Sequence, residues 1–375
     1  MNNQSTPTKS QRIEGLDVSR SLAILGMIVV HSMLVMSDGM PPQRWSDFLL
    51  NLLDGRAAAT FVILAGMGVT LMARKAKDPT GTPNQETIAA ILRRRGLLLL
   101  AVGFLNLTIW EGDILRVYGV SLLVVPWLVW RSSHAVLLTA MGFVLAFGVL
   151  FAVFDYSHNW DWTAMKYHRL WTVSGLVRNL FYDGFRSVFP WTGLLLLGVC
   201  LGRSDWSKAD VPRKAVLWGV VLLVSSAAFS KSLLSWFSVH PRPGFGQEDS
   251  AACFGLQSMP PLPLFLLNAT GFALVLIGTS TLVARRWNDR WIVRALSATG
   301  RLAFTWYVAH ILLGLGGIIV LGWTRVSHLR ALITALAFFS AAAMVSLWWN
   351  RRFARGPLEF ILRRVEYDKT LPSSM

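Results

Sequence analysis

One stripe of polar residues on the first apolar segment has the spacing that chemistry inside a membrane requires. Arg20 and His31 are eleven residues apart, which at roughly 100° per residue returns to nearly the same helix face about three turns along. Asp17 lies one turn before Arg20, close to that face. Almost every residue between Arg20 and His31 is apolar. We therefore expect Arg20 near a membrane surface and His31 roughly 16 Å deeper, around the middle of the bilayer.

An ionisable residue at that depth is costly to bury and is by default a candidate functional group. His31 can act as a general base or as a transient acyl carrier, because imidazole activates an acceptor near pH 7. It can equally be a buried histidine that hydrogen-bonds to another helix. Arg20 and Asp17 form either an ion pair at the membrane interface or, with Arg20 turned into the bundle, a site for a phosphate or carbonyl oxygen.

Further polar residues lie where apolar segments begin or end, and each set can bind an acceptor that carries a hydroxyl or an amine. They are Asp54 and Arg56 before the second segment, Glu111, Asp113 and Tyr118 around a tight turn, and Tyr307 and His310 in the ninth segment. Each set also has a simpler interpretation. The second segment has small residues that suit helix packing, and the turn can be an exposed ion pair. His310 either faces the same cavity as His31 or is a packed core residue.

The elements that must position these residues are predicted to be membrane helices. Of the 375 residues, 54% are hydrophobic and 15% are charged, whereas soluble domains carry about 25% charged residues. The sequence predicts an all-α, polytopic integral membrane protein, with one transmembrane domain over 1–375 and outer loops at 155–186 and 238–261. Ten apolar segments are predicted to span the membrane: 20–37, 57–73, 96–110, 114–130, 134–154, 187–202, 215–237, 262–284, 302–322 and 330–349.

The distribution of basic residues predicts the orientation of the chain. With both termini in the cytoplasm, about 25 of the 36 Lys and Arg residues lie on the cytoplasmic side. This pattern accounts for the net charge of +16 without a nucleic-acid partner, and membrane lipids are the expected contacts. The third and fourth segments are short and closely linked, so we expect a hairpin with its tip outside. The outer loop 155–186 has the pattern of an amphipathic helix lying on the outer surface.

Five pieces of sequence resemble known membrane acyltransferases. Leu16-Asp17-Val18-Ser19-Arg20 followed by His31 resembles the opening of the acyltransferase-3 branch of the transmembrane acyltransferase superfamily. A closer resemblance is to YeiB-type bacterial membrane proteins and the heparan-alpha-glucosaminide N-acetyltransferase-like domain. It depends on segments that occur in order along nearly the whole chain: 15–20, 54–66, 112–119, 300–307 and 355–359. The resemblance divides the chain into a motif-bearing N-terminal half (1–130) and a YeiB-type C-terminal half (187–375).

The resemblance implies an acyl-CoA-dependent O- or N-acyltransferase of the bacterial cytoplasmic membrane. Such enzymes move an acyl group, usually acetyl, from cytosolic acetyl-CoA to a sugar or a lipid-linked envelope acceptor such as a glycolipid. We expect no metal, and a homodimer is left open. The candidate residues are His31, Arg20 and Asp17 for catalysis, Arg20, Arg74, Arg93, Arg94 and Arg95 for the CoA phosphates, and Arg56, Asp54, Glu111, Asp113, Tyr118, Tyr307 and His310 for the acceptor.

A protein of another class remains as the alternative. Intramembrane histidine and arginine serve equally well in a transporter or exporter of a small amphiphile or anion. Inverted sequence repeats are typical of many such transporters, and none is recognisable in this sequence. Binding of CoA distinguishes the two classes, because the acyltransferase requires it and the transporter does not.

Overall fold

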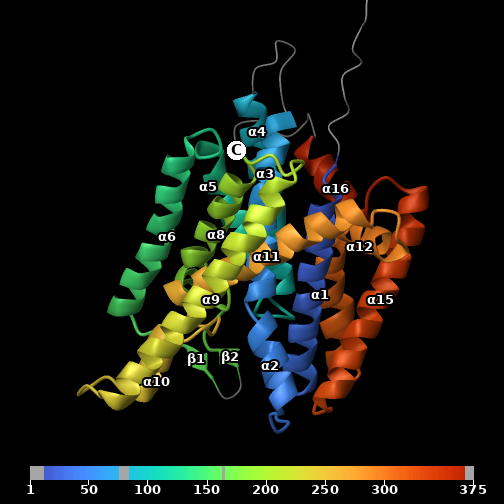
Figure 1. The fold of residues 1–375 in the computed structure, drawn as a ribbon. Helices are drawn as coiled ribbons and strands as arrows, with labels where there is room; N and C mark the ends of the chain where they lie inside the picture. The colour runs from blue at the N-terminus through green and yellow to red at the C-terminus, as the bar shows by residue number, and fades with distance from the viewer. Residues whose placement is uncertain (1–11, 76–83, 163–164, 368–375) are drawn as a thin grey trace, which may run out of the picture.

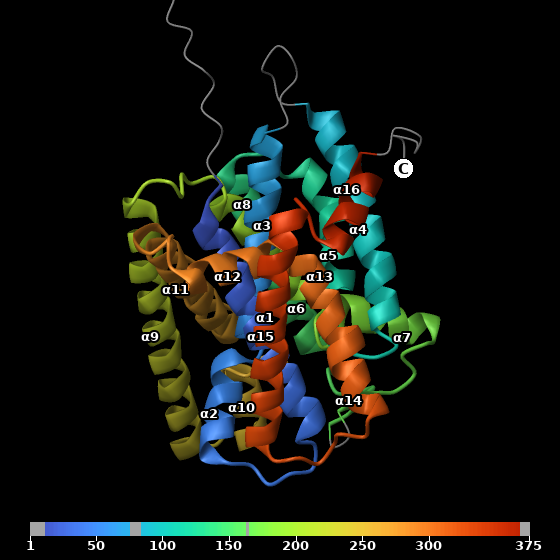
Figure 2. The ribbon, with the colours of Figure 1, turned by 90° about the vertical axis from the view of Figure 1, so that its right-hand side faces the viewer.

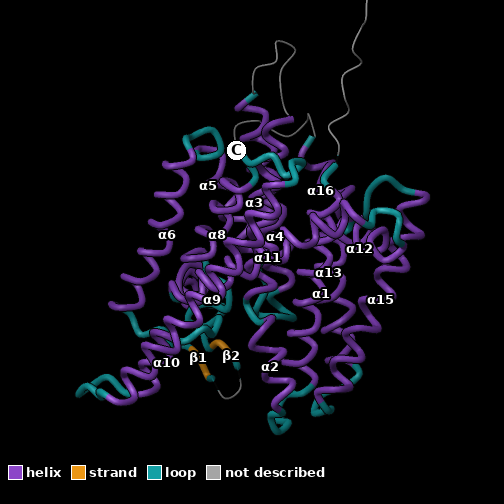
Figure 3. The backbone as a smooth tube through the Cα atoms, in the orientation of Figure 1, coloured by secondary structure: helices purple, strands orange, loops and turns teal. Residues whose placement is uncertain are grey.

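The chain folds into a bundle of helices that run between two opposite faces. The computed structural model describes residues 12–75, 84–162 and 165–367. Apart from one short β-hairpin, the regular elements of this part are helical (Figures 1 and 3). The prediction of an all-α membrane protein is therefore confirmed. In chain order the elements are α1 (Glu14–Met36), α2 (Arg44–Leu53), α3 (Arg56–Lys75), α4 (Gln85–Asn106), α5 (Leu115–Val124), η1 (Val125–Trp127), α6 (Ser133–Val153), β1 (Trp160–Asp161), β2 (Lys166–Tyr167), α7 (Val173–Arg178), η2 (Asn179–Asp183), α8 (Val188–Leu201), α9 (Asp210–Val239), α10 (Gln247–Phe254), α11 (Pro263–Arg286), α12 (Trp291–Arg301), α13 (Ala303–Ala309), η3 (His310–Leu315), α14 (Gly316–Val320), α15 (His328–Arg352) and α16 (Pro357–Glu366).

Seven helical segments of the described chain are long and apolar enough to cross a membrane. They are α1, α2 with α3, α6, α9, α11, α13 through α14, and α15. An eighth is added if α7 and η2, which meet α8 at a bend of 44°, form one span with it. All ten predicted segments are at least partly helical, but the count of ten spans is not confirmed. The reasons are that α4 carries three consecutive arginines and α5 has only 10 residues.

Helix α1 lies in the middle of the bundle and positions the polar stripe. It packs against α3, α11, α12 and α15, and 17 of its 23 residues are buried. Close approach between helices depends on glycines. A side chain at Gly300 of α12 would overlap the backbone carbonyl of Asp17, and one at Gly66 of α3 would overlap that of Leu195 in α8. The first contact fixes the distance between α12 and α1, with its polar stripe, and the second fixes the distance between α3 and α8.

The two faces of the bundle differ in charge. The start of α1, the end of α3, the start of α4 and α16 lie together at one end of the molecule (Figures 1 and 2). We call this end the basic face, because Arg12, Arg74, Arg95 and Arg363 belong to those segments. The opposite face carries α2, α10 and the β-hairpin (Figure 1). By the positive-inside rule the basic face is the one we propose for the cytoplasm.

The third and fourth predicted segments form the expected hairpin. Helices α4 and α5 pack along each other, and Gly96 and Gly119 bring their backbones together. A Cβ atom built at either glycine would lie 2.8 Å from the carbonyl oxygen of the other. The turn between the helices holds Glu111 and Asp113, so the hairpin delivers these carboxylates to one place.

The outer loop 155–186 is not the single amphipathic helix that the sequence suggested. It folds into a cap made of the β1–β2 hairpin, the short helix α7 and the π-turn η2. The helix prediction is wrong because Trp160 and Tyr167 point inward to polar partners, while Trp162 and Trp171 stay exposed. The Trp160 indole donates to the Asp183 carbonyl at 2.7 Å, and the Tyr167 hydroxyl donates to the Asp183 carboxylate at 2.7 Å.

Candidate functional site

Two histidines from distant parts of the chain meet inside the bundle. His31 comes from α1 and His310 from the first residue of η3, and their exposed fractions are 7% and 2%. The Nδ1 atom of His31 lies 3.1 Å from the Nε2 atom of His310. Their rings are stacked with centroids 5.3 Å apart. The structure therefore places the two intramembrane histidines in one site.

The hydrogen bonds of the pair define the tautomer of each ring. The His310 Nδ1 atom lies 3.3 Å from the backbone carbonyl of Trp306, and a carbonyl only accepts, so Nδ1 of His310 carries the hydrogen. In a neutral ring, Nε2 of His310 then accepts, and the Nδ1–H of His31 is the donor to it. The Nε2 atom of His31 is left with its lone pair. A neutral imidazole held with one free nitrogen has the form of a general base.

Aromatic residues surround the pair. The Trp110 ring lies 4.7 Å from that of His31 and the Tyr307 ring lies 5.2 Å from that of His310, both measured between centroids. Trp110 in turn contacts Phe185 of the outer cap, with centroids 5.7 Å apart. The Trp110 indole N–H is buried without a hydrogen-bond partner among the described residues. An unused donor therefore lies beside His31.

Asp113 is fully buried and holds the turn between α4 and α5 to the histidine site. It accepts hydrogen bonds from the Asn106 amide at 2.9 Å, from the Leu115 backbone N–H at 2.8 Å and from the Tyr307 hydroxyl at 3.2 Å. Arg116, also fully buried, donates to the Asn179 side chain at 3.1 Å. With its oxygens already occupied, Asp113 positions Tyr307 and with it the neighbouring His310.

Glu111 belongs to the outer cap rather than to the histidine pair. Its carboxylate accepts the Tyr167 backbone N–H at 3.1 Å. Burial raises the pKa of Glu111 above its ordinary value, while the Tyr167 hydrogen bond and the charges of Lys166 and Arg116 act in the opposite direction. The two carboxylates of the predicted turn are thus separated into one that faces the cap and one that faces Tyr307.

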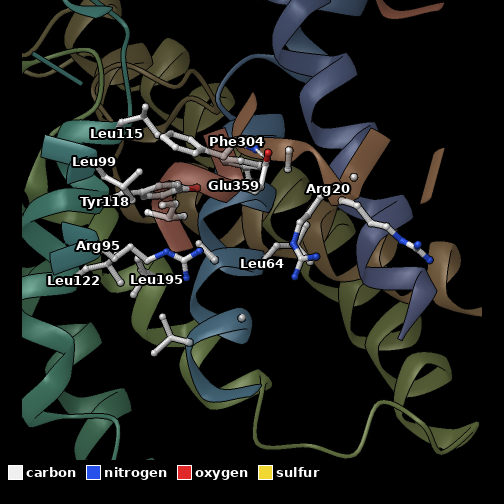
Figure 4. Close-up of a pocket in the computed structure, with 18 of the residues that line it drawn as sticks. Arg20, Leu64, Arg95, Leu99, Leu115, Tyr118, Leu122, Leu195, Phe304 and Glu359 are labelled. Carbon is white, nitrogen blue, oxygen red and sulfur yellow. Dashed lines mark hydrogen bonds between the residues drawn. The ribbon is translucent and has the colours of Figure 1, made fainter. Parts of the chain in front are cut away.

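A cavity of about 330 Å³ opens at the basic end of the bundle (Figure 4). Arg20 and Arg95 lie on opposite sides of it, with Leu64 between them (Figure 4), and Arg12 and Arg301 complete the basic lining. Apolar side chains form most of the rest of its wall, together with Tyr118 and Glu359, whose carboxylate accepts hydrogen bonds from the Phe304 and Thr305 backbone N–H groups. A basic mouth above an apolar lining suits a ligand with a phosphate group and a long uncharged arm.

In this structure Arg20 forms an ion pair with Asp17 and lines the cavity at the same time. The two interpretations of Arg20 therefore do not exclude each other. The Arg20 guanidinium donates to the Asp17 carboxylate at 2.5 Å while Arg20 lines the cavity. Arg12 also bonds to Asp17, at 2.6 and 3.1 Å. Two cations share one carboxylate, so the group keeps a net positive charge. Arg20 retains a second guanidinium nitrogen that takes no part in its bond to Asp17.

An aromatic layer lies between this cavity and the histidine pair. The Phe61 ring stacks on Tyr118 and on Tyr307, each with centroids 5.8 Å apart. Phe61 and Tyr118 line the cavity, and Tyr307 contacts His310. The Tyr118 hydroxyl is buried and makes no hydrogen bond within the described chain. It is an unused donor on a residue of the cavity wall.

Other candidate residues lie away from both the pair and the cavity. Arg56 donates to the Asn268 side chain at 2.8 Å and to the Asn51 carbonyl at 2.6 Å. Asp54 accepts from the Ser258 hydroxyl at 2.6 Å and pairs with Arg186 at 3.4 Å. These bonds tie the start of α3 to α11 and to the loop before it, at the end of α3 that lies away from the basic face.

Of the arginines predicted to bind the CoA phosphates, some line the cavity and others bond elsewhere. Arg95 lines the cavity and pairs with Glu366 at 3.2 Å. Arg94 donates to the Glu366 backbone carbonyl at 3.3 Å, and Arg93 lies beside it on α4. Arg74, at the end of α3, donates to the Arg203 backbone carbonyl. Of these four, only Arg95 is part of the cavity wall.

Sequence reasoning missed Asn106, Trp110 and Asn179. Asn106 is an amide inside an otherwise apolar stretch, and this is the signal that identifies it in retrospect. Asn179 lies in a loop whose fold the sequence did not reveal. No group of three or more His, Cys, Asp or Glu residues within the described ranges is placed to hold a metal ion.

The fold and the site define a class of protein: an all-α membrane protein with a histidine pair inside its bundle and a basic cavity at one end. The family model described as "Heparan-alpha-glucosaminide N-acetyltransferase, catalytic" matches residues 12–218, which is more than half of the chain, and the chain belongs to this family. Residues 201–369 match a second family, described as a protein of unknown function (DUF418). His31 lies in the first matched segment and His310 in the second.

Three bacterial relatives match almost the whole chain. YeiB of Escherichia coli K12, described as an uncharacterized protein, is 24% identical over 396 residues, 93% of this chain and 95% of the relative. An uncharacterized 39.9 kDa protein of Bacillus acidopullulyticus is 24% identical over 96% of each chain. YxaH of Bacillus subtilis 168 is 22% identical over 96% of this chain and 95% of the relative. The predicted resemblance to YeiB-type proteins is confirmed.

Proposed function

We propose that this protein transfers an acetyl group from acetyl-CoA, bound at the basic face, to a hydroxyl or amine of a sugar or lipid-linked acceptor. The observation that carries the proposal is the buried pair of His31 and His310, in which the Nε2 atom of His31 keeps a free lone pair. The family to which the chain belongs is described as an N-acetyltransferase. Together they favour acyl transfer over transport.

The cavity at the basic face is the site that we propose for the donor. Phosphates of CoA would meet Arg12, Arg20, Arg95 and Arg301, because guanidinium groups bind phosphate through paired hydrogen bonds. The uncharged pantetheine arm would lie along the apolar wall. The acetyl end would then approach Tyr118, whose free hydroxyl can donate to the thioester oxygen as negative charge develops there.

The chemistry needs one proton acceptor close to the nucleophile. The acceptor oxygen or nitrogen attacks the thioester carbon and forms the new bond, while Nε2 of His31 takes its proton. The carbon–sulfur bond then breaks, and the CoA sulfur leaves with the proton returned by the His31 imidazolium. His310 accepts the Nδ1–H of His31 throughout and keeps the ring in the required orientation. In this scheme His31 is a base, not an acyl carrier.

The aromatic layer sets a condition on this route. Phe61 stacks between Tyr118 and Tyr307, so the thioester reaches His31 only when the Phe61 side chain turns aside. In the resting arrangement the layer separates the donor cavity from the acceptor side and so limits loss of acetyl groups to water.

Replacing Arg20 with glutamine tests the donor site. Loss of a charged hydrogen bond to phosphate costs about 1.5–3 kcal/mol, so we expect KM for acetyl-CoA to rise roughly 10–100-fold with a smaller change in kcat. Asp17 keeps Arg12 as its partner, which protects the fold. Arg74→Gln is the matched control on the same face but outside the cavity. An equal rise in KM for Arg74→Gln would show that Arg20 is not a specific part of the donor site.

The activity itself is tested by release of CoA from acetyl-CoA. Purified protein in proteoliposomes is given glucosamine in one series and a bacterial membrane-lipid extract in another, and the free thiol is measured. We expect acceptor-dependent release in at least one series. If folded protein releases no CoA in either series, the proposal fails and transport of an anion becomes the better account of the site.

A further inference from the structure

A second cavity, of about 360 Å³, lies at the basic end of the bundle and shares one lining residue, Arg301, with the donor cavity. Its wall is formed by residues of α12, the start of α1 and the end of α15, and α12 packs against both of the other helices. Its lining includes Arg294, Arg301 and Arg351 but only one acidic residue, Glu14. Among the described residues, no carboxylate lies within ion-pair distance of these three arginines. The cavity therefore concentrates positive charge that the protein itself does not neutralise.

A polar side chain in the same wall also lacks a partner. Ser297 is 4% exposed, and its hydroxyl makes no hydrogen bond within the described part of the chain. A buried hydroxyl is normally satisfied. Asn350, across the cavity on α15, donates to the Ala298 carbonyl at 3.1 Å and thereby fixes α15 to α12. Positive charge, a free hydroxyl and an amide in one cavity suit a phosphate group.

The surroundings of the cavity indicate where such a phosphate comes from. Helix α12 lies across the bundle instead of along it (Figures 1 and 2). At its start, Trp291 lines the cavity with an exposed fraction of 67%, followed by Ile292 at 53%. Trp348, near the end of α15, is 50% exposed. Exposed tryptophans beside arginines are typical of the level of lipid headgroups.

We propose that this cavity binds the phosphate of an anionic phospholipid at the basic face. Arg294, Arg301 and Arg351 neutralise the phosphate, Ser297 donates to one of its oxygens, and the acyl chains pass outward beside Trp291. Arg301 lines this cavity and the donor cavity. The bound headgroup thus contacts Arg301, which is also part of the wall of the donor cavity. The proposal does not depend on acyl transfer, because its test measures lipid binding alone.

The test compares the full chain in nanodiscs of phosphatidylcholine with and without phosphatidylglycerol. A ligand that binds only the folded state raises the unfolding temperature. We expect phosphatidylglycerol to raise it, and the double variant Arg294→Gln/Arg351→Gln to lose most of that rise. Arg286→Gln/Arg364→Gln, with the same loss of charge outside the cavity, is the matched control and should keep it. An equal loss in both double variants would show general surface attraction and overturn the proposal.

Two further measurements distinguish a lipid from a nucleotide in the cavity and control for loss of folding. Ser297→Ala removes an unsatisfied buried group, so it should be neutral or stabilising in phosphatidylcholine and should reduce the increment from phosphatidylglycerol. Addition of 3′,5′-ADP, the nucleotide part of CoA, to phosphatidylcholine nanodiscs should give no shift that depends on Arg294 and Arg351. If it gives such a shift and phosphatidylglycerol does not, the cavity binds a nucleotide and the lipid assignment is wrong.

Discussion

Replacing His31 with glutamine is expected to lower acetyl transfer by about 10²–10⁴-fold, the usual contribution of a general base. Glutamine keeps a hydrogen-bond donor that can reach His310, but it has no lone pair basic enough to take a proton. The cavity that we assign to the donor does not include His31, so acetyl-CoA should bind as in the wild type. The measurement is the rate of CoA release at saturating acetyl-CoA, beside equilibrium binding.

His310 provides the matched comparison. His310→Gln offers a carbonyl oxygen that accepts the Nδ1–H of His31, whereas His310→Leu offers none. We expect a larger fall in kcat for leucine than for glutamine, with KM for acetyl-CoA unchanged in both. Wild-type transfer in His31→Gln would remove the base from the mechanism. Equal rates in the two His310 variants would remove the hydrogen bond between the rings from it.

Replacing Gly300 with valine should have the largest effect on folding. A side chain here would overlap the backbone carbonyl of Asp17, because the end of α12, where Gly300 is buried, packs directly on the first turn of α1. Extra volume in a well-packed interior costs about 1–3 kcal/mol, occasionally more, and this overlap is with backbone. We therefore expect little folded protein, measured as the monodisperse fraction after extraction and as a lowered unfolding temperature.

Gly148→Val is the control for that experiment. Gly148 lies in α6, where an added Cβ meets no atom within 4 Å. The substitution Gly148→Val should therefore leave the yield and the unfolding temperature nearly unchanged. If Gly300→Val folds as well as Gly148→Val, the tight packing of α12 on α1 is not required for the fold. The position of the Arg20 and Asp17 ion pair against α12 would then need another explanation.

The parts of this structure that sequence could predict are those with a local signal. The apolar segments, the α4–α5 hairpin and the stripe of Asp17, Arg20 and His31 follow from hydropathy and helical periodicity. The pairing of His31 with His310 has no local signal, because the residues are 279 positions apart and only helix packing brings them together. Sequence could mark each as a candidate and offer a shared cavity as one alternative, but it could not decide between that and a packed core histidine.

The outer loop and the second span show where periodicity fails. In 155–186 the spacing of aromatic residues fits a surface helix, yet the buried carboxylate and carbonyl of Asp183 attract Tyr167 and Trp160 into a cap. Arg56 fits a binding residue equally well by type. Only the structure shows that its guanidinium is already occupied by Asn268 and the Asn51 carbonyl. The partners of a polar side chain, not its type, decide its role.

The central claim is that the cavity at the basic face receives acetyl-CoA and serves the histidine pair. Equilibrium binding of radiolabelled acetyl-CoA to the purified protein tests it most directly. The account predicts saturable binding that free CoA displaces, that persists in His31→Gln and that weakens in Arg20→Gln. Absence of binding at millimolar acetyl-CoA, with the protein shown to be folded, would contradict the account and leave the histidine pair to a transporter.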